Sequence, residues 1–197
     1  MCDHGEKKMK CDIILAGVGG QGILTLSYAI VNACLDEGYN VLQSEIHGMS
    51  QRGGAVYAHL RISDKKIYSD MIPKGRADII LGTEPLEALR HLDHLTPEGK
   101  IITSSVPVKN IIYPDEAKVL DELRRHGALL LDSTDLARKA GSIKAQNIVM
   151  LGAVSRFLPL KTLKMYIKKL FSKKGKEIVK INLLAFDLGL ITKCWEI

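Results

Sequence analysis

Short apolar runs alternate with amphipathic stretches along most of the chain, and this alternation is typical of an α/β protein. The apolar runs predict strands, whereas apolar residues at every third or fourth position predict helices. From residue 145 onward the pattern is helical, with breaks at Pro159 and Gly175. We expect strands at residues 12–16, 39–44, 77–81, 100–103 and 128–131, and helices at 22–37, 83–95 and 114–125.

A different pattern interrupts this alternation between residues 45 and 72. Residues 45–54 are polar and glycine-rich, without a helical or strand period, so they predict a loop. Residues 55–62 alternate apolar and polar positions, 64–66 supply a turn, and 67–72 continue as a partner strand, which predicts an antiparallel hairpin. Together the patterns predict a three-layer α/β/α, Rossmann-like domain with a mixed, mostly parallel sheet.

The length of 197 residues fits a single domain, with a core at about 11–155 and a helical C-terminal part at about 145–197. No apolar run reaches the roughly 18–20 residues of a membrane span, and the first eight residues lack the apolar centre of a secretory signal. We therefore expect a cytoplasmic protein without a membrane partner. The cysteines lack C-x-x-C spacing, which predicts reduced, mostly buried thiols and no metal ligands. They are Cys2, Cys11, Cys34 and Cys194.

The formal charge of +6 is unevenly distributed, because eight lysines lie between residues 161 and 180, where Glu177 is the only acid. Leucine, isoleucine and phenylalanine recur among them at helical spacing, which predicts the solvated face of a packed helix. Docking of an acidic protein or of a polyphosphate is the alternative, and we expect no nucleic-acid partner. The lysines are Lys161, Lys164, Lys168, Lys169, Lys173, Lys174, Lys176 and Lys180.

A glycine-rich turn lies between the first predicted strand and the first predicted helix. Glycine allows positive φ and close approach of a ligand to the backbone, and the free N–H groups of the following helix attract an anion. The turn therefore predicts a phosphate-binding site, although the same spacing also occurs where a strand and a helix only pack closely. Its candidate residues are Gly17, Gly19, Gly20, Gln21 and Gly22.

The predicted loop at 45–54 carries polar side chains that suit phosphate or carboxylate, and glycines that let the backbone approach a ligand. Its candidates are Glu45, His47, Ser50, Gln51, Arg52, Gly53 and Gly54. The alternative is a self-satisfied loop in which Arg52 pairs with Glu45. No serine or cysteine nucleophile accompanies His47 in a recognisable motif, so we assign no catalytic residue.

Two further residues are candidates for the same end of the sheet. Glu84 follows a predicted strand and precedes Pro85, so it either contacts the ligand or interacts with the start of its own helix. Asn147 either contacts the ligand or packs between helices.

Glu45 also permits a second hypothesis, in which it binds the ribose of a nicotinamide or flavin dinucleotide. The predicted hairpin counts against this hypothesis, because a dinucleotide domain would continue with a crossover to another parallel strand. No second mononucleotide-binding half is evident in the sequence.

The glycine turn at 17–22 together with the segment 44–54 resembles the gamma domain of the 2-oxoacid:ferredoxin oxidoreductases, and especially the beta subunits of their indolepyruvate branch. Similar stretches follow at 82–88 and 147–153, so the resemblance covers about residues 11–155. It implies a complex that oxidatively decarboxylates indolepyruvate and other arylpyruvates to aryl-acetyl-coenzyme A and passes the electrons to ferredoxin.

The same resemblance divides the work between subunits. Thiamine diphosphate and 4Fe–4S clusters are expected on a larger alpha subunit, and this chain has neither a G-D-G…N signature nor a series of clustered cysteines. The gamma domain is associated with coenzyme A binding and subunit contact. We therefore expect this chain to be a noncatalytic subunit that orients coenzyme A. The alternatives are a stand-alone NAD(P)-binding oxidoreductase and a purely structural subunit.

Overall fold

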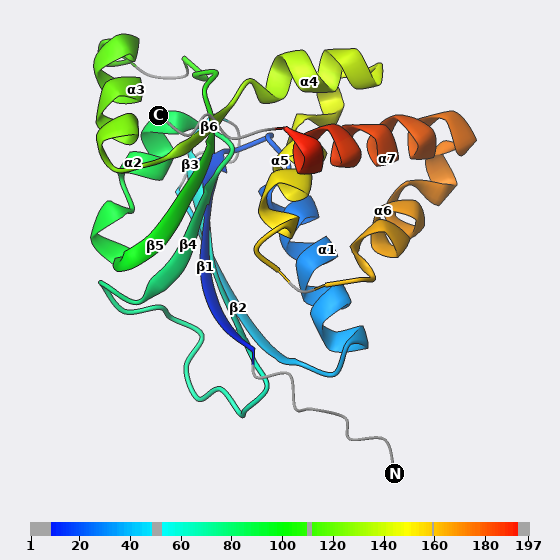
Figure 1. The fold of residues 1–197 in the computed structure, drawn as a ribbon, viewed down its shortest axis with the longest axis horizontal. Coiled ribbons are helices and arrows are strands. Elements are labelled where there is room, and N and C mark those ends of the chain that lie inside the picture. The colour runs from blue at the N-terminus through cyan, green and yellow to red at the C-terminus, as the bar shows by residue number, and fades with distance from the viewer. Residues whose placement is uncertain (1–8, 49–52, 110–111, 159, 193–197) are drawn as a thin grey trace.

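A six-stranded sheet forms the centre of the molecule (Figure 1). The computed structural model describes residues 9–48, 53–109, 112–158 and 160–192, and the statements below concern these residues. The strands are β1 (Lys10–Val18), β2 (Asn40–His47), β3 (Ala55–Ser63), β4 (Ala77–Gly82), β5 (Leu95–Ser104) and β6 (Leu129–Leu131). The five apolar runs expected as strands are thus all found, with shifted ends.

The sheet has the order β2-β3-β1-β4-β5-β6. Strand β3 runs antiparallel to both β1 and β2, whereas β4, β5 and β6 continue the sheet in parallel from β1. Strands β1 and β2 therefore point the same way and are joined by α1 (Ile23–Asp36), but β3 lies between them. The predicted mixed, mostly parallel sheet is confirmed.

The predicted hairpin between residues 55–62 and 67–72 is wrong. Strand β3 pairs with β2 and β1 instead, and the backbone after it is held by side chains of β3. Arg61 donates from Nη1 to the carbonyls of Ser69 (3.0 Å) and Met71 (3.3 Å), while the amide of Ile72 donates to Nδ1 of His59 (2.9 Å). The antiparallel partner of β3 at the sheet edge is β2, and the connection between them is the segment 48–54.

Helices cover both faces of the sheet, as Figure 1 shows. Two of them lie on one face: α2 (Pro85–Leu89) and α3 (Glu116–Arg125). On the other face lie α1, α4 (Ser133–Ala140), α5 (Gln146–Ser155), α6 (Leu163–Phe171) and α7 (Lys176–Ile191). The three-layer α/β/α architecture is confirmed.

The helix expected at residues 83–95 is shorter than predicted. Helix α2 ends at Leu89, a 3₁₀ turn at Leu92–His94 follows, and β5 already begins at Leu95. The apolar residues Leu86, Leu89, Leu92 and Leu95 nevertheless pack on one core, as their spacing indicates. Helical periodicity therefore marked the buried side correctly and overestimated the length of the helix.

Alternating residues of the central strands divide the interior into two cores. Ile13 and Leu15 pack under α1 and α5, whereas Ile14, between them, packs with Ile80 under α2 and α3. All four side chains are fully buried. This double-sided burial explains why the central strands are continuous apolar runs rather than alternating ones.

The expectations for the cysteines and for the lysine-rich segment are also met within the described residues. Cys11 and Cys34 are free and buried, and burial raises the pKa of each thiol to about 12. In α6, Leu163 and Ile167 are buried, whereas all eight lysines at 161–180 are exposed, so the segment does form a solvated face. In the described residues no helix is both long and apolar enough to cross a membrane.

Candidate functional site

The glycine-rich turn joins the carboxyl end of β1 to the first turn of α1 and is locked by one side chain. The amide of Val18 donates to Oε1 of Gln21 (2.8 Å), and the amide of Gln21 donates to the carbonyl of Val18 (3.1 Å). Nε2 of Gln21 donates to the carbonyl of Thr83, just beyond β4 (3.0 Å). Gln21 is therefore a positioning residue, because both ends of its side chain are used within the fold.

Three glycines of the turn have different physical roles. A Cβ at Gly17 would lie 2.0 Å from Oγ1 of Thr83, and a Cβ at Gly22 would lie 2.4 Å from Nδ2 of Asn147, so both positions are closed by packing. Gly20 has a φ of 102°, which glycine adopts readily, and space for a Cβ. The backbone at Gly20 is thus open to a ligand, as a phosphate-binding turn requires.

The segment after β2 returns to the glycine turn through two backbone hydrogen bonds. The amide of Gly19 donates to the carbonyl of Gly54 (2.8 Å), and the amide of Gly53 donates to the carbonyl of Gly19 (3.3 Å). The two motifs that the sequence placed in one site are therefore in contact. Ser50, Gln51 and Arg52 lie outside the described residues.

The amide groups of Gly20, Gly22, Ile23 and Leu24 donate no hydrogen bond to any described residue, whereas the amide of Gly19 is already used by Gly54. Helix α1 begins here without a side-chain cap and without an acidic residue in its first turn. Free amides at an uncapped helix start, together with the helix dipole, favour a bound anion. The glycines of the turn are therefore not equivalent: the amide of Gly19 is used within the fold, whereas the amides of Gly20 and Gly22 donate to no described residue.

A cavity of about 340 Å³ lies in front of these amides. Gly19, Gly20, Gly22 and Ile23 line it from the turn, and His47 lines it from the end of β2. The remaining lining residues are Val18, Leu24, Thr25 and Val56, none of which was predicted from the sequence. Leu24 and Thr25 could have been found by counting into the first turn of α1, where a bound anion must contact the helix.

Glu45 and His47 belong to β2 rather than to a loop, so this part of the predicted loop is wrong. Oε2 of Glu45 lies 3.4 Å from Nε2 of His47, and Gln43 donates a hydrogen bond to the same carboxylate. Glu45 stands opposite Ala58 of β3, which in turn stands opposite Leu15 of β1. One strand thus separates Glu45 from β1, unlike the adjacent strand that presents the ribose-binding acid in a dinucleotide fold.

Glu84 and Asn147 are fully engaged by neighbouring protein groups. Glu84 is 1% exposed; it caps α2 by accepting from the amide of Glu87 (2.8 Å), and it also accepts from the hydroxyl of Tyr113 (2.6 Å). Burial and this carboxylate raise the pKa of Tyr113. Asn147 donates to the carbonyl of Gly22 (3.4 Å), which fixes the start of α1 against α5. The contacts of both residues are those of structural groups.

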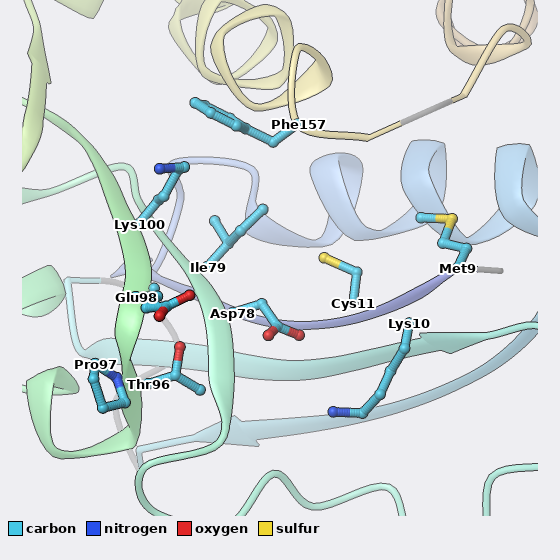
Figure 2. A pocket seen from close by; sticks show the side chains of 11 residues that line it. Met9, Lys10, Cys11, Asp78, Ile79, Thr96, Pro97, Glu98, Lys100 and Phe157 are labelled. Atoms are coloured by element: carbon cyan, nitrogen blue, oxygen red, sulfur yellow. The ribbon is translucent and has the colours of Figure 1, made fainter.

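A larger cavity of about 650 Å³ lies at the opposite end of the strands (Figure 2). Met9, Cys11, Ile79 and Phe157 form its apolar side, and Lys10, Lys100, Asp78 and Glu98 bring charges of both signs. Asp78 already accepts from the amide of Asp12 (2.8 Å). This mixed lining does not select an anion, and no sequence pattern predicts this cavity.

Three histidines and a tyrosine form a ring cluster on the face of the sheet that carries α2. Tyr57 packs on His91 with 4.5 Å between ring centroids, and His94 lies near both His59 and His91. Burial lowers the pKa of His91 to about 4 and also lowers that of His59. Within the described residues no group of three or more His, Cys, Asp or Glu side chains could hold a metal ion.

Comparisons with known proteins identify relatives over almost the whole chain. The family model for pyruvate ferredoxin/flavodoxin oxidoreductase matches residues 12–191. Indolepyruvate oxidoreductase subunit IorB of Pyrococcus horikoshii is 36% identical over 190 residues, covering 91% of this chain and 94% of the relative. The IorB subunit of Methanothermobacter thermautotrophicus is 35% identical over 192 residues, covering 92% and 96%.

Solved structures show the same fold. The 2-oxoglutarate:ferredoxin oxidoreductase of Magnetococcus marinus, described with 2-oxoglutarate, coenzyme A and succinyl-CoA bound, matches with a TM-score of 0.74 and 28% identity over 93% of this chain. This chain spans 31% of that longer chain. The gamma subunit of a keto/oxoacid ferredoxin oxidoreductase from Geobacter sulfurreducens matches with a TM-score of 0.64 at 22% identity, covering 91% of this chain and 96% of its own. The chain therefore belongs to the pyruvate ferredoxin/flavodoxin oxidoreductase family, where its homologues are IorB subunits of indolepyruvate oxidoreductase and gamma subunits of 2-oxoacid:ferredoxin oxidoreductases.

Proposed function

We propose that this chain is a noncatalytic subunit of a cytoplasmic, ferredoxin-dependent complex that converts indolepyruvate and other arylpyruvates to aryl-acetyl-coenzyme A. Its role is to hold coenzyme A by a phosphate group at the glycine turn. The observation that carries this role is that the amides of Gly20, Gly22, Ile23 and Leu24 donate to none of the described residues and lie in front of a cavity. The coenzyme A in the related Magnetococcus marinus structure supports the choice of anion.

The residues of the turn fit a phosphate group. Phosphate offers only acceptor oxygens at neutral pH, and the free amides of the turn and the first turn of α1 offer only donors. No acidic side chain in the first turn of α1 repels the charge. The cavity of about 340 Å³ is at the small end of ligand sites, which are about 300–1,000 Å³, so it suits the phosphate part of coenzyme A rather than the whole molecule.

Orientation is the chemical contribution that such a site makes. Coenzyme A brings the reacting thiol, and this chain's amides hold its phosphate end so that the other end faces the partner subunit. Fixing one reactant in this way removes part of the entropic cost of a bimolecular step. We assign thiamine diphosphate and the 4Fe–4S clusters to a larger alpha subunit, because the four cysteines of this chain do not occur in cluster spacing.

An apolar stripe on α1 suits the contact with that larger subunit. Leu24, Tyr28 and Leu35 are 50%, 43% and 54% exposed, and Val31 continues the stripe between them at helical spacing. Leu24 also lines the cavity at the glycine turn. A partner that covers this stripe would therefore close the cavity from one side.

Thr25 offers a sharp test, because it lines the cavity and lies in the first turn of α1. Thr25→Glu places a carboxylate where the phosphate is expected, and an acid at this end of a helix does not weaken the helix. In the assembled complex we expect Thr25→Glu to raise the Kd for coenzyme A at least about tenfold, roughly 1.4 kcal/mol, measured by calorimetric titration. Thr25→Gln is the neutral control of similar length and should bind within about twofold of the wild type.

Titrations also separate the proposed role from the two alternative functions. Equal coenzyme A affinity in the wild type, Thr25→Glu and Thr25→Gln would favour a purely structural subunit. Tight binding of NAD(P) by the isolated chain, lost in Glu45→Gln, would favour the stand-alone oxidoreductase.

A further inference from the structure

Eight lysines form one surface, here called the lysine surface: Lys161 lies just before α6, and the others lie in α6, in the 3₁₀ turn at Ser172–Lys174 and in the first part of α7. Their segment carries the whole net charge of the chain. Residues 161–187 hold eight of the 28 basic residues and two of the 22 acidic ones, Glu177 and Asp187, which leaves twenty of each sign elsewhere. Asp187 lies 2.6 Å from Nζ of Lys164, and this ion pair leaves seven lysines and Glu177 in the segment. The lysine surface is therefore a strong local field on an otherwise balanced molecule.

The helices that display these lysines are firmly attached. Oε1 of Glu37, just after α1, accepts hydrogen bonds from the amides of Lys161 (2.6 Å) and Thr162 (2.9 Å) at the start of α6. Tyr166 donates its hydroxyl to Asp36 (2.6 Å). Leu163 and Ile167 anchor the inner side of α6 in the core. The charges are thus presented by a fixed scaffold.

The lysine surface is separate from the glycine turn. Helix α6 begins beside Glu37 at the carboxyl end of α1, whereas the glycine turn lies at the amino end of the same helix. The 14 residues of α1 place about 20 Å between the two. A lysine near the start of α6 is therefore too far from the turn to bind the same phosphate group, so the proposed phosphate site does not explain the lysine surface.

The choice of residue type points to a transient protein partner. Residues 161–192 contain no arginine, the residue favoured in permanent interfaces and in nucleic-acid binding. Of the aromatic side chains in this segment, Tyr166 and Phe186 are buried, and Phe171 is partly buried against the core, so none of them is an open stacking platform for bases. Lysine is strongly hydrated, so it suits the long-range attraction of an oppositely charged protein that must also dissociate again.

We propose that the lysine surface attracts and docks ferredoxin, the acidic electron carrier that the family's reaction requires. A cluster held by four cysteine thiolates gives its protein a local negative charge, which complements the lysine surface. This inference rests on the proposed function only in that the complex must use ferredoxin; it does not depend on where coenzyme A binds.

Charge reversal in the assembled complex tests the inference. The variant Lys168→Glu/Lys169→Glu/Lys173→Glu changes three exposed lysines of the surface, and the matched control Lys65→Glu/Lys118→Glu/Lys144→Glu changes three exposed lysines elsewhere by the same charge. We expect the first variant to raise the KM for ferredoxin at least about tenfold at low salt, with kcat for a small viologen dye unchanged. The difference should nearly vanish at about 1 M salt, where the Debye length is about 3 Å.

Three results would overturn the inference. An equal KM for ferredoxin in the first variant and the control would show that the surface does not attract it. Loss of the larger subunit from the first variant during gel filtration would make the lysines a fixed interface instead. Binding of a labelled single-stranded RNA by the wild type, lost in the first variant, would assign the surface to nucleic acid. A complex with normal ferredoxin behaviour but no coenzyme A affinity would instead reject the proposed function alone.

Discussion

Gln21 and Thr83 hold each other by two reciprocal hydrogen bonds. Nε2 of Gln21 donates to the carbonyl of Thr83 (3.0 Å), and Oγ1 of Thr83 donates to Oε1 of Gln21 (2.9 Å). The pair joins the glycine turn after β1 to the end of β4, 62 residues later in the chain. The shape of the turn is thus fixed by the neighbouring strand and not by the glycines alone.

Removal of the hydrogen bonds between Gln21 and Thr83 should lower the stability of the fold and also disturb the shape of the glycine turn. Gln21→Leu leaves the carbonyl of Thr83 and the amide of Val18 without their partner, so we expect a loss of about 2 kcal/mol in the free energy of unfolding. Thr83→Val removes one of the same bonds. In a double-mutant cycle by urea denaturation, we expect a coupling of about 0.5–2 kcal/mol between the two positions; strictly additive effects would show that the pair does not act as a unit.

Gly22 and Gly20 should differ sharply in their tolerance of alanine. Both have positive φ, at 79° and 102°, so each substitution carries backbone strain of about 1 kcal/mol or more. A Cβ at Gly22 also meets Nδ2 of Asn147 at 2.4 Å, whereas a Cβ at Gly20 meets open space. We therefore expect Gly22→Ala to lower the melting temperature more than Gly20→Ala.

A companion variant checks the cause of that difference. Asn147→Ala in the Gly22→Ala background removes the clashing amide, so it should bring the cost of Gly22→Ala close to that of Gly20→Ala. No relief by Asn147→Ala, or equal melting temperatures for the two single variants, would contradict the packing role of Gly22.

His91 should make the protein less stable in mild acid. Its pKa is about 4 in the folded protein against an ordinary value of 6.5, because burial and the nearby His94 and His59 disfavour the charged ring. Between these values the unfolded chain binds a proton that the folded chain does not, so the free energy of unfolding falls as the pH falls. From pH 7 to pH 5 we expect His91 to contribute about 1–2 kcal/mol of this loss.

Replacement of His91 by phenylalanine keeps the ring contact with Tyr57 and removes the titration. The free energy of unfolding of His91→Phe, measured by urea denaturation across this range, should depend less on pH than that of the wild type. A pH dependence as steep as that of the wild type would assign the acid sensitivity to other groups.

The sequence predicts the layers, the six strands of the sheet and the contact between two distant motifs, because these depend on local periodicity and on glycine chemistry. It does not predict that β3 inserts between β1 and β2, since Ala55–Ser63 has the same alternation whichever strand it pairs with. The predicted partner strand at 67–72 does not form, and there Arg61 donates hydrogen bonds to the carbonyls of Ser69 and Met71 instead.

In the candidate site too, some features can be predicted from the sequence and others cannot. The turn is found from its glycines, but which amides remain free depends on the return of Gly53 and Gly54 to Gly19, a contact between segments far apart in sequence. Glu84 looked equally suited to a ligand, yet its carboxylate is occupied by α2 and Tyr113. Occupancy by the protein's own groups is a three-dimensional property that residue type cannot reveal.

The most direct measurement is a structure of the assembled complex with coenzyme A bound. We predict a phosphate group within hydrogen-bonding distance of the amides of Gly20, Ile23 and Leu24, beside His47. Coenzyme A held at another surface of this chain, or by the larger subunit alone, would contradict the assignment.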